Sequence, residues 1–274
     1  MKMTPEDPRT GTDLLDPLDG INRSRRWFRP GQTVLVAFSA GLDSTALLDL
    51  LVRLAARVRF RVEAATVDHG LRPFSQEIST AAGLCARLSA THHVLALEPG
   101  LAERSRSACT SLQEQARTER YALLASIALR IGADRIATAH HADDQAETLL
   151  LRLSAGTGLD GLSGILEQRD DRVVRPLLSF RREDLERYVA LRGLPFVEDP
   201  TNRSARFVRN RIRSSVIPAL VEAVPSAVLG IARSAALLSN ERAVVDSLLD
   251  EKLEKASRTA LEMGQEGLSV AALG

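Results

Sequence analysis

The sequence predicts an α/β protein, with a doubly wound, parallel, five-stranded sheet followed by a small helical region. Two observations favour this fold. Short apolar runs alternate with longer segments of helical periodicity along the first part of the chain, as in parallel sheets that helices cover on both faces. Polar clusters follow three of these runs. Because parallel strands end at the same edge of a sheet, we expect these clusters to share one ligand site.

The first strand is expected at residues 33–38, a continuous apolar and β-branched run typical of a buried parallel strand. Ser44 lies where the N-cap of the next helix should be, before an apolar-periodic segment at 46–52. The same alternation places further strands at 62–67, 93–97 and 135–139, and helices at 75–89, 111–131 and 144–153. Four of the five strands can therefore be located.

The remaining segments predict turns and helices. A short helix is expected near residues 21–28, and the glycine-rich segment 156–164 indicates turns. Later helices are expected at 182–191, at 208–217, where Pro218 should stop the helix, and at 226–263. The last of these carries an apolar stripe, formed by Ile231, Ala235, Leu238, Val245, Leu248 and Leu253.

The composition is that of a globular chain, because 45% of its 274 residues are hydrophobic and 26% are charged. The opening residues do not resemble a signal peptide. No run approaches the roughly 18 apolar residues of a membrane span, so we expect no membrane association. Cys85 and Cys109 form no CxxC pair, which favours a reducing, cytoplasmic setting.

The loop Ser39-Ala40-Gly41-Leu42-Asp43-Ser44 follows the first strand. Its backbone N–H groups and the start of the next helix suit a phosphate, to which the two serine hydroxyls can donate. A carboxylate at Asp43 conflicts with an anion unless Mg²⁺ bridges the two. The loop is neither a Walker A motif nor a GxGxxG fingerprint. The alternative is a plain strand-to-helix turn capped by Ser44.

A second cluster, His140-His141-Ala-Asp143-Asp144 with Glu147, follows the strand at 135–139. Such side chains can bind a metal, position a nucleophile or exchange protons. Zinc is disfavoured because the spacing is not that of HExxH. The structural alternative is a capping box, with Asp144 as the N-cap and Glu147 three residues later.

Two smaller groups are less specific. Asp68 and His69 end a neighbouring strand, where they can contact a ribose or a base edge, or where His69 is an ordinary loop residue. Arg117, Arg120 and Tyr121 lie in a helix. They form either a solvated, ion-paired face or a group that points into a cleft.

Five arginines and no acid occupy residues 203–213, which favours a surface that contacts phosphates. These are Arg203, Arg206, Arg209, Arg211 and Arg213. We expect two or three of them to reach RNA, Arg209 and Arg213 together because residues four apart share a helical face. The alternative is that they pair with acids such as Glu198 and Asp199.

The loop SAGLDS resembles the PP-loop of N-type ATP pyrophosphatases. Other motifs extend the resemblance to the tRNA(Ile)-lysidine synthetase family over about residues 31–220: VDHGLR, QEQARTERY, HHADDQAETLLLRL, GTGLDGLSG, RPLL, FVEDPTN and RNRIRSSVIPAL. Ala40 departs from the glycine usual in that family. Because alanine disfavours a positive φ, either Ala40 takes an ordinary φ or the phosphate cradle is reshaped.

The resemblance implies an ATP-dependent ligase that joins free L-lysine to carbon 2 of the wobble cytidine of tRNA(Ile) with a CAU anticodon. An adenylated cytidine is the intermediate, and AMP and pyrophosphate are released. The implied ATP-binding residues are Ser39, Ala40, Gly41, Leu42, Asp43 and Ser44, to which we add Asp68 and His69, with Asp43 also on Mg²⁺. The implied catalytic residues are Asp43, Arg117, His140, Asp144 and Glu147, and those for tRNA are Arg206, Arg209 and Arg213.

The expected organisation is an N-terminal extension at residues 1–30, a catalytic PP-loop domain at 31–220 and a helical segment at 221–274. The last residues begin to resemble a new element, so we expect a shortened version of longer relatives. A PP-loop tRNA thiolase and a non-catalytic nucleotide-binding module are the alternatives. Neither the oligomeric state, for which a dimer is one option, nor the residues that select lysine can be predicted.

Overall fold

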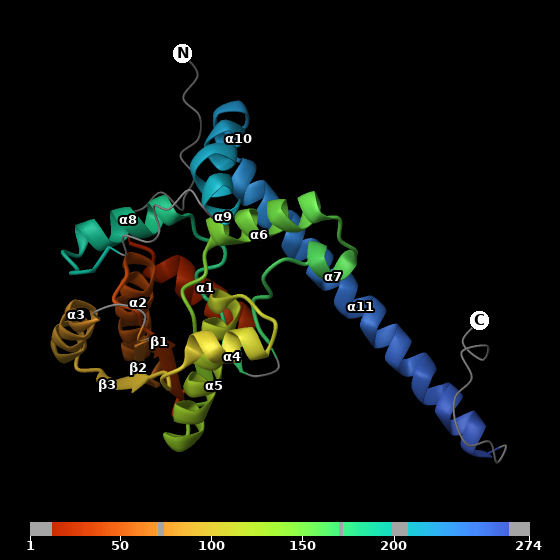
Figure 1. Ribbon diagram of the computed structural model, residues 1–274, viewed down its shortest axis with the longest axis horizontal. Coiled ribbons are helices and arrows are strands. Elements are labelled where there is room, and N and C mark those ends of the chain that lie inside the picture. The colour runs from red at the N-terminus through yellow and green to blue at the C-terminus, as the bar shows by residue number, and fades with distance from the viewer. Residues whose placement is uncertain (1–12, 69, 71–73, 170–171, 199–207, 263–274) are drawn as a thin grey trace.

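A five-stranded, all-parallel sheet forms the centre of the computed structural model, which describes residues 13–68, 70, 74–169, 172–198 and 208–262. The strand order is β3-β2-β1-β4-β5, and Figure 1 labels β3, β2 and β1. The strands are β1 (Thr33–Ala37), β2 (Arg61–Asp68), β3 (Thr91–Ala96), β4 (Arg135–Ala137) and β5 (Val173–Val174). The predicted doubly wound fold is confirmed.

The central strand β1 shows why an apolar run predicts a strand that helices cover on both faces. Val34 and Val36 pack in one core cluster, with the residues of α2 (Leu42–Val58). Leu35 packs in a second cluster, with residues of α5 (Leu112–Arg130). Because successive side chains of a strand point to opposite faces, α2 and α5 lie on opposite sides of the sheet.

Most of the predicted helices are present with small shifts. Besides α2 and α5, the helices of the structure are α1 (Leu15–Arg25), α3 (Ser75–Arg87), α4 (Leu101–Ser107), α6 (Ala142–Ala155), α7 (Leu159–Leu162), α8 (Arg182–Leu191), α9 (Val208–Arg211), the π-helix η3 (Ile212–Val216), α10 (Ile217–Ala223) and α11 (Ala227–Glu262). Of these, α4 and α10 were not predicted, and α7 is a single helical turn within residues 156–164, for which turns were expected. The helix expected near 21–28 instead ends at Arg25, and Phe28 after it is buried. Leu15 and Leu18 of α1 join the core cluster of α2.

Pro218 does not stop a helix, so that prediction is wrong. It lies in the first turn of α10, directly after the π-helix Ile212–Val216. A proline is tolerated in a first turn because its missing N–H would have no helical partner there. The wider turns of η3 thus allow the chain to pass from α9 into α10. A π-helix is often found at a functional site, and this one carries Arg213.

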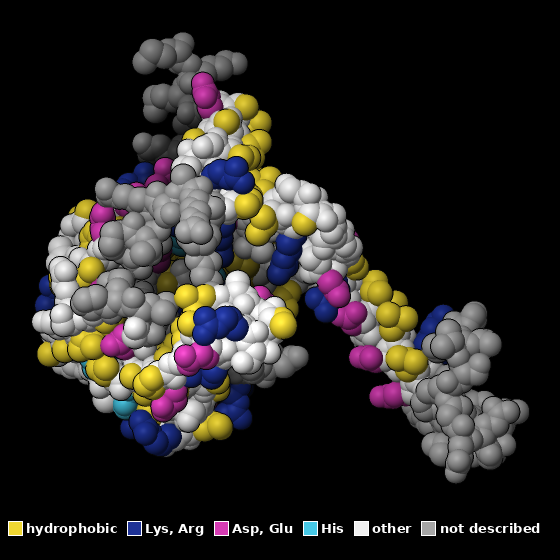
Figure 2. All heavy atoms as spheres, in the orientation of Figure 1, with side chains coloured by type: hydrophobic (Ala, Val, Ile, Leu, Met, Phe, Trp, Pro, Cys, Tyr) yellow, Lys and Arg dark blue, Asp and Glu magenta, His cyan; other side chains and the backbone are white. Residues whose placement is uncertain are grey.

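The long helix α11 leaves the globular part of the chain (Figure 1). Only the first part of its predicted apolar stripe is buried: Ala235 is inaccessible and Ile231 packs against a core cluster with α6 residues. Figure 2 shows hydrophobic side chains along its projecting length. Val245, Leu248 and Leu253 are among the exposed ones.

No single helix of the described ranges is long and apolar enough for a membrane span. The segments Val208–Ala223 and Ala227–Lys255 meet the length and composition criteria only as a pair, and they are bent by 99° at their junction.

A buried polar contact ties α8 to α2. Asp49 is fully buried in α2, and the Tyr188 hydroxyl donates to its Oδ2 at 2.5 Å. Arg192 adds an Nε–H bond to the same oxygen at 3.1 Å. Since a buried carboxylate without hydrogen-bond donors is costly, this contact should stabilise the packing of α8 against α2.

Tyr188→Phe is expected to lower the free energy of unfolding by about 1.5–3 kcal/mol, the value of a hydrogen bond to a charged group. Urea denaturation of the purified chain measures the change. Arg187→Ala is the matched control, because Arg187 lies on the same helix and its ion pair with Asp184 is largely exposed. That control should lose no more than about 1 kcal/mol. Equal losses in the two variants would contradict a stabilising role for the buried contact.

Candidate active site

The loop between β1 and α2 keeps a left-handed residue at its tightest point. Ala40 has φ of 58° and is fully buried. Its carbonyl accepts the Val197 N–H at 2.8 Å, which holds the turn from outside. The alternative of an ordinary φ at Ala40 is therefore wrong. A left-handed alanine costs about 1–2 kcal/mol, and burial of its methyl group offsets part of that cost.

Two serine hydroxyls close this loop. Ser44 Oγ accepts the Ser39 N–H at 3.2 Å and donates to the Gly41 carbonyl at 3.0 Å. The two hydroxyl oxygens are 3.1 Å apart. The helix begins at Leu42 with Gly41 as its N-cap, so the prediction of Ser44 as the N-cap is wrong. The first N–H groups of a helix lack helical partners and suit an anion, so the loop has the form of a phosphate cradle.

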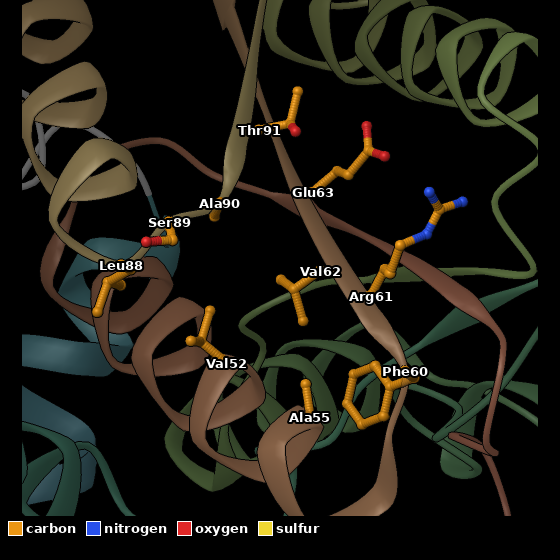
Figure 3. A pocket seen from close by; sticks show the side chains of 10 residues that line it. All are labelled: Val52, Ala55, Phe60, Arg61, Val62, Glu63, Leu88, Ser89, Ala90 and Thr91. Carbon is orange, nitrogen blue, oxygen red and sulfur yellow. The ribbon is translucent and has the colours of Figure 1, made fainter.

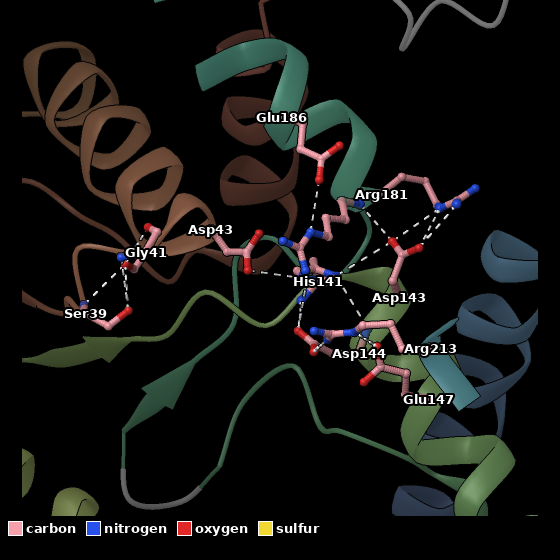
Figure 4. Close-up of polar contacts among 12 residues, drawn as sticks. Ser39, Gly41, Asp43, His141, Asp143, Asp144, Glu147, Arg181, Glu186 and Arg213 are labelled. Carbon is pink, nitrogen blue, oxygen red and sulfur yellow. Dashed lines mark hydrogen bonds and ion pairs between the residues drawn. The ribbon is translucent and has the colours of Figure 1, made fainter. Parts of the chain in front are cut away.

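Asp43 and His141 connect this loop to the start of α6. His141 is fully buried, and its Nε2 lies 3.7 Å from Asp43 Oδ2 and 3.4 Å from Asp144 Oδ2 (Figure 4). Asp143 Oδ2 is 3.7 Å from its Nδ1. Burial alone would lower the pKa of His141, but Asp43, Asp144 and Asp143 outweigh it and raise that pKa. His141 thus joins the predicted loop and the predicted acidic cluster, a role that no spacing in the sequence indicates.

Asp43 has the properties expected of a metal ligand. Its Oδ1 is buried and has no hydrogen-bond partner, which is costly for a carboxylate oxygen. Within the described ranges, no three His, Cys, Asp or Glu side chains form a metal site. An oxygen-seeking cation with one protein carboxylate and further ligands from phosphates and water, as Mg²⁺ prefers, fits this arrangement.

The capping box at the start of α6 lies three residues earlier than predicted. His141 is the N-cap, and its backbone N–H donates to Asp144 Oδ2 at 3.1 Å. The Asp144 N–H approaches His141 Nδ1 at 3.4 Å in return. The prediction of Asp144 as N-cap with Glu147 is therefore wrong. Glu147 instead lies inside the helix and is fully buried.

Arg209 and Arg213 pair with the candidate catalytic acids. Arg209 Nε donates to Glu147 Oε2 at 2.8 Å, and Arg213 Nε donates to Glu147 Oε1. Both guanidinium groups also reach Asp144 Oδ1, at 3.2 and 3.3 Å. Of the acids suggested as alternative partners, Asp199 lies outside the described residues. The partners observed for these two arginines are Asp144 and Glu147.

His140 is held in its neutral form. Its Nδ1 lies 2.9 Å from Thr138 Oγ1. Burial is the largest cause that lowers its pKa, and Arg175, Arg117 and Arg120 lower it further, while Asp144 opposes them. Arg117 thus lies within electrostatic reach of His140. A pKa lowered to about 3 keeps the imidazole neutral near pH 7 and makes it a weak base, so His140 is suited to hydrogen bonding rather than to taking up a proton.

The other predicted site residues do not belong to the group of side chains that His141 connects. Asp68 ends β2, the neighbour of β1, and its Oδ1 accepts the Gly70 N–H at 2.8 Å. Its role at a nucleotide stays a prediction. His69, Arg203 and Arg206 lie outside the described residues.

A cavity of about 290 Å³ lies apart from this cluster (Figure 3). It is lined by Val52, Ala55, Phe60, Arg61, Val62, Glu63, Leu88, Ser89, Ala90 and Thr91. These residues surround the amino ends of β2 and β3. Ligands of doubly wound sheets bind at the carboxyl ends, where the PP-loop-like segment and α6 meet, so this cavity is not the candidate active site.

The sheet and its loop define an ATP-binding protein of the PP-loop class. Residues 17–220, well over half of the chain, match the family described as the PP-loop domain. The chain is 39% identical over 252 residues to a tRNA(Ile)-lysidine synthase of Geobacter sulfurreducens, covering 88% of this chain and 53% of that protein. It is 40% identical over 262 residues to the one of Methylobacterium nodulans, with 92% and 74% covered. The chain belongs to the tRNA(Ile)-lysidine synthase family.

Two further comparisons concern the length of the relatives and the fold of a solved structure. The chain spans about half the length of the Geobacter relative and of the Symbiobacterium thermophilum relative, 53% and 47%. Among solved structures, the U34-tRNA thiolase NcsA of Methanococcus maripaludis with its [4Fe-4S] cluster has a similar fold. The TM-score is 0.70 at 16% identity, covering 83% of this chain and 80% of that one.

Proposed function

We propose that this chain ligates free L-lysine to carbon 2 of the wobble cytidine of tRNA(Ile) with a CAU anticodon, with ATP and Mg²⁺ as cofactors. The observation that carries the proposal is the contact of His141 with both Asp43 and Asp144. It brings a phosphate-binding loop against a cluster of acids, a neutral histidine and arginines. The relatives named tRNA(Ile)-lysidine synthase support the same reaction.

The first step activates the base. The cytidine O2 attacks the α-phosphorus of ATP, the bond to the bridging oxygen breaks, and pyrophosphate leaves. The loop between β1 and α2 would hold the phosphates through the first N–H groups of α2, which have no helical partners. A magnesium ion, when bound, would neutralise the pyrophosphate charge, and Asp43 is the residue that would hold it. Arg117 would orient the base beside this loop.

The second step forms the new bond. The ε-amine of lysine attacks carbon 2, the bond from carbon 2 to O2 breaks, and AMP leaves with the former carbonyl oxygen. The amine must first lose one proton and its nitrogen loses another after attack. Asp144 is the group that would take up these protons. Neutral His140 and Glu147, whose two oxygens accept from Arg209 and Arg213, would hold the surrounding groups in place.

The test is lysine-dependent release of AMP. The chain is incubated with ATP, Mg²⁺ and a tRNA(Ile) transcript that carries CAU. AMP should appear with lysine, and not with ornithine or arginine, and not with an elongator methionine tRNA that carries the same anticodon. Release that is independent of lysine, or equal with both tRNAs, would contradict the proposal. The reaction takes place where ATP and tRNA are available, so we infer a cytoplasmic location.

A thiolase is disfavoured by the cysteines of this chain. Iron–sulfur clusters are held by several cysteine thiolates, whereas this chain has two cysteines in all. Cys85 is buried, and burial raises the pKa of its thiol to about 11. Cys109 is exposed and lies in another segment. A buried thiol of high pKa is a poor nucleophile.

The Cys85→Ala, Cys109→Ser double variant is therefore expected to keep lysine ligation within about threefold of wild type, because the nucleophile is the lysine amine. Initial rates of AMP release, measured on a variant whose circular dichroism matches that of wild type, provide the check. A folded double variant without activity would favour thiol chemistry.

A further inference from the structure

The residue at the start of α8 conflicts with the usual preferences of a helix terminus. Arg181 is the N-cap of α8, where short polar or acidic side chains are preferred and where a positive charge opposes the helix dipole. Its side chain is nevertheless only 15% exposed. Since natural proteins break such local preferences mainly at functional sites, the contacts of Arg181 indicate a role beyond the stability of α8.

Asp143 of α6 compensates for this arginine. Its Oδ2 accepts the Arg182 N–H at 2.8 Å, so an acid of another helix caps α8. Arg181 Nε lies 3.2 and 3.3 Å from the two carboxylate oxygens of Asp143, and Arg181 Nη2 lies 3.2 Å from Oδ1 (Figure 4). The Ala142 N–H donates to the Phe180 carbonyl at 2.8 Å beside this pair. The starts of α6 and α8 are therefore held together by both side-chain and backbone contacts.

Asp143 also faces His141. Its Oδ2 lies 3.7 Å from His141 Nδ1, and the Asp144 N–H approaches the same nitrogen at 3.4 Å. The other ring nitrogen, Nε2, is buried without a hydrogen-bond partner and lies between Asp43 and Asp144. One edge of the His141 ring is thus held at the start of α6, and the opposite edge faces the acids of the proposed reaction.

The later part of α8 is fixed independently of this pair. The Tyr188 hydroxyl donates to the buried Asp49 of α2, and Asp43 lies in the first turn of the same helix α2. Loss of the contact between Arg181 and Asp143 should therefore leave α8 packed on α2. The part of the site that such a loss changes is the surroundings of His141.

We infer that Arg181 and Asp143 are positioning residues, which hold the His141 ring where it faces both Asp43 and Asp144. The expected effect on rate rests on the proposed function, whereas the effect on the His141 ring does not. A pair that orients a ring without binding a substrate should change the rate at saturation and leave the KM values unchanged. Neither residue has to contact ATP, lysine or tRNA for this role.

The first test follows the histidine rings by NMR at one fixed pH. The His141 signal is the one that disappears in His141→Gln. Asp143→Asn and Arg181→Gln should each shift this signal. Arg187→Gln is the matched control, because Arg187 lies on the same helix with a side chain that is 57% exposed, and it should leave the signal unchanged. A His141 signal that neither Asp143→Asn nor Arg181→Gln moves would overturn the inference, whatever reaction the chain catalyses.

The second test is the AMP-release assay, run well below the melting temperature of each variant. In Asp143→Asn and in Arg181→Gln, kcat should fall about tenfold or more, with unchanged KM for ATP and lysine. The double variant should be no slower than the slower single variant, because both changes remove the same contact. Arg181→Lys keeps the positive charge and should recover part of the rate.

Three kinetic results would overturn the inference. They are an equal fall of kcat in Arg187→Gln, losses that multiply in the double variant, and a lower melting temperature with an unchanged kcat, which would assign the pair to structure alone. Absence of lysine-dependent AMP release from wild type would instead overturn the proposed function. The NMR comparison would then still decide whether Arg181 and Asp143 position His141.

Discussion

Asp43→Asn is expected to abolish lysine-dependent AMP release while the fold stays intact. The Oδ1 atom of Asp43 is buried without a hydrogen-bond partner at the start of α2. In the proposed reaction this oxygen would hold the cation that neutralises the leaving pyrophosphate. Loss of one such charge at a phosphate-transfer site should cost about 3–4 kcal/mol of transition-state stabilisation, at least a hundredfold in rate.

Single-turnover AMP formation measures this loss at saturating ATP and Mg²⁺. Asp16→Asn is the matched control, because the Asp16 side chain is 81% exposed on α1. It should react at the wild-type rate. Near-normal turnover in a folded Asp43→Asn protein would mean that the loop after β1 is a structural turn. Inactivity shared by both variants would indicate a general effect of the substitution on the protein.

The sheet could be predicted because burial on both faces leaves a direct pattern. Val34, Leu35 and Val36 are all inaccessible, so every position of the strand has to be apolar. The fifth strand has only two residues, Val173–Val174, and no periodicity can reveal so short a strand. The edge that carries the site follows from topology alone, since β1, β2 and β4 are neighbours in the sheet.

Side-chain partners were harder to predict because they depend on helix boundaries. A shift of two or three residues at the starts of α2 and α6 changed the roles of Ser44 and Asp144. His141 belonged to the predicted polar cluster, but its position between Asp43 and Asp144 was not predicted, because it depends on the approach of two helix N-termini. The residue spacing had already indicated the acids themselves. Which arginines face them depends on α9 and η3, and a π-helix cannot be read from periodicity.

Arg209 and Arg213 have a second role as partners of Glu147, besides the contact with tRNA that we expect of them. Glu147 is fully buried, and both of its carboxylate oxygens are occupied, one by Arg209 and one by Arg213. Either arginine alone can still partner the acid. Loss of both would leave a buried carboxylate without a counter-charge, which typically costs about 3–5 kcal/mol. The two arginines therefore stabilise the site as well as adding positive charge to it.

The Arg209→Ala, Arg213→Ala double variant is expected to lose about 3–5 kcal/mol of unfolding free energy, measured by urea denaturation. Adding Glu147→Gln should recover most of the loss, because the unpaired charge is removed.

Well below the melting temperature, tRNA binding by the Arg209→Ala, Arg213→Ala double variant should also weaken. The slope of the logarithm of the tRNA binding constant against the logarithm of the salt concentration should become shallower by about 0.7–0.9 for each arginine that contacts a phosphate. ATP binding should change little. A salt dependence identical to that of wild type, together with the stability loss, would mean that Arg209 and Arg213 serve Glu147 alone. The tRNA surface would then have to lie elsewhere on the chain.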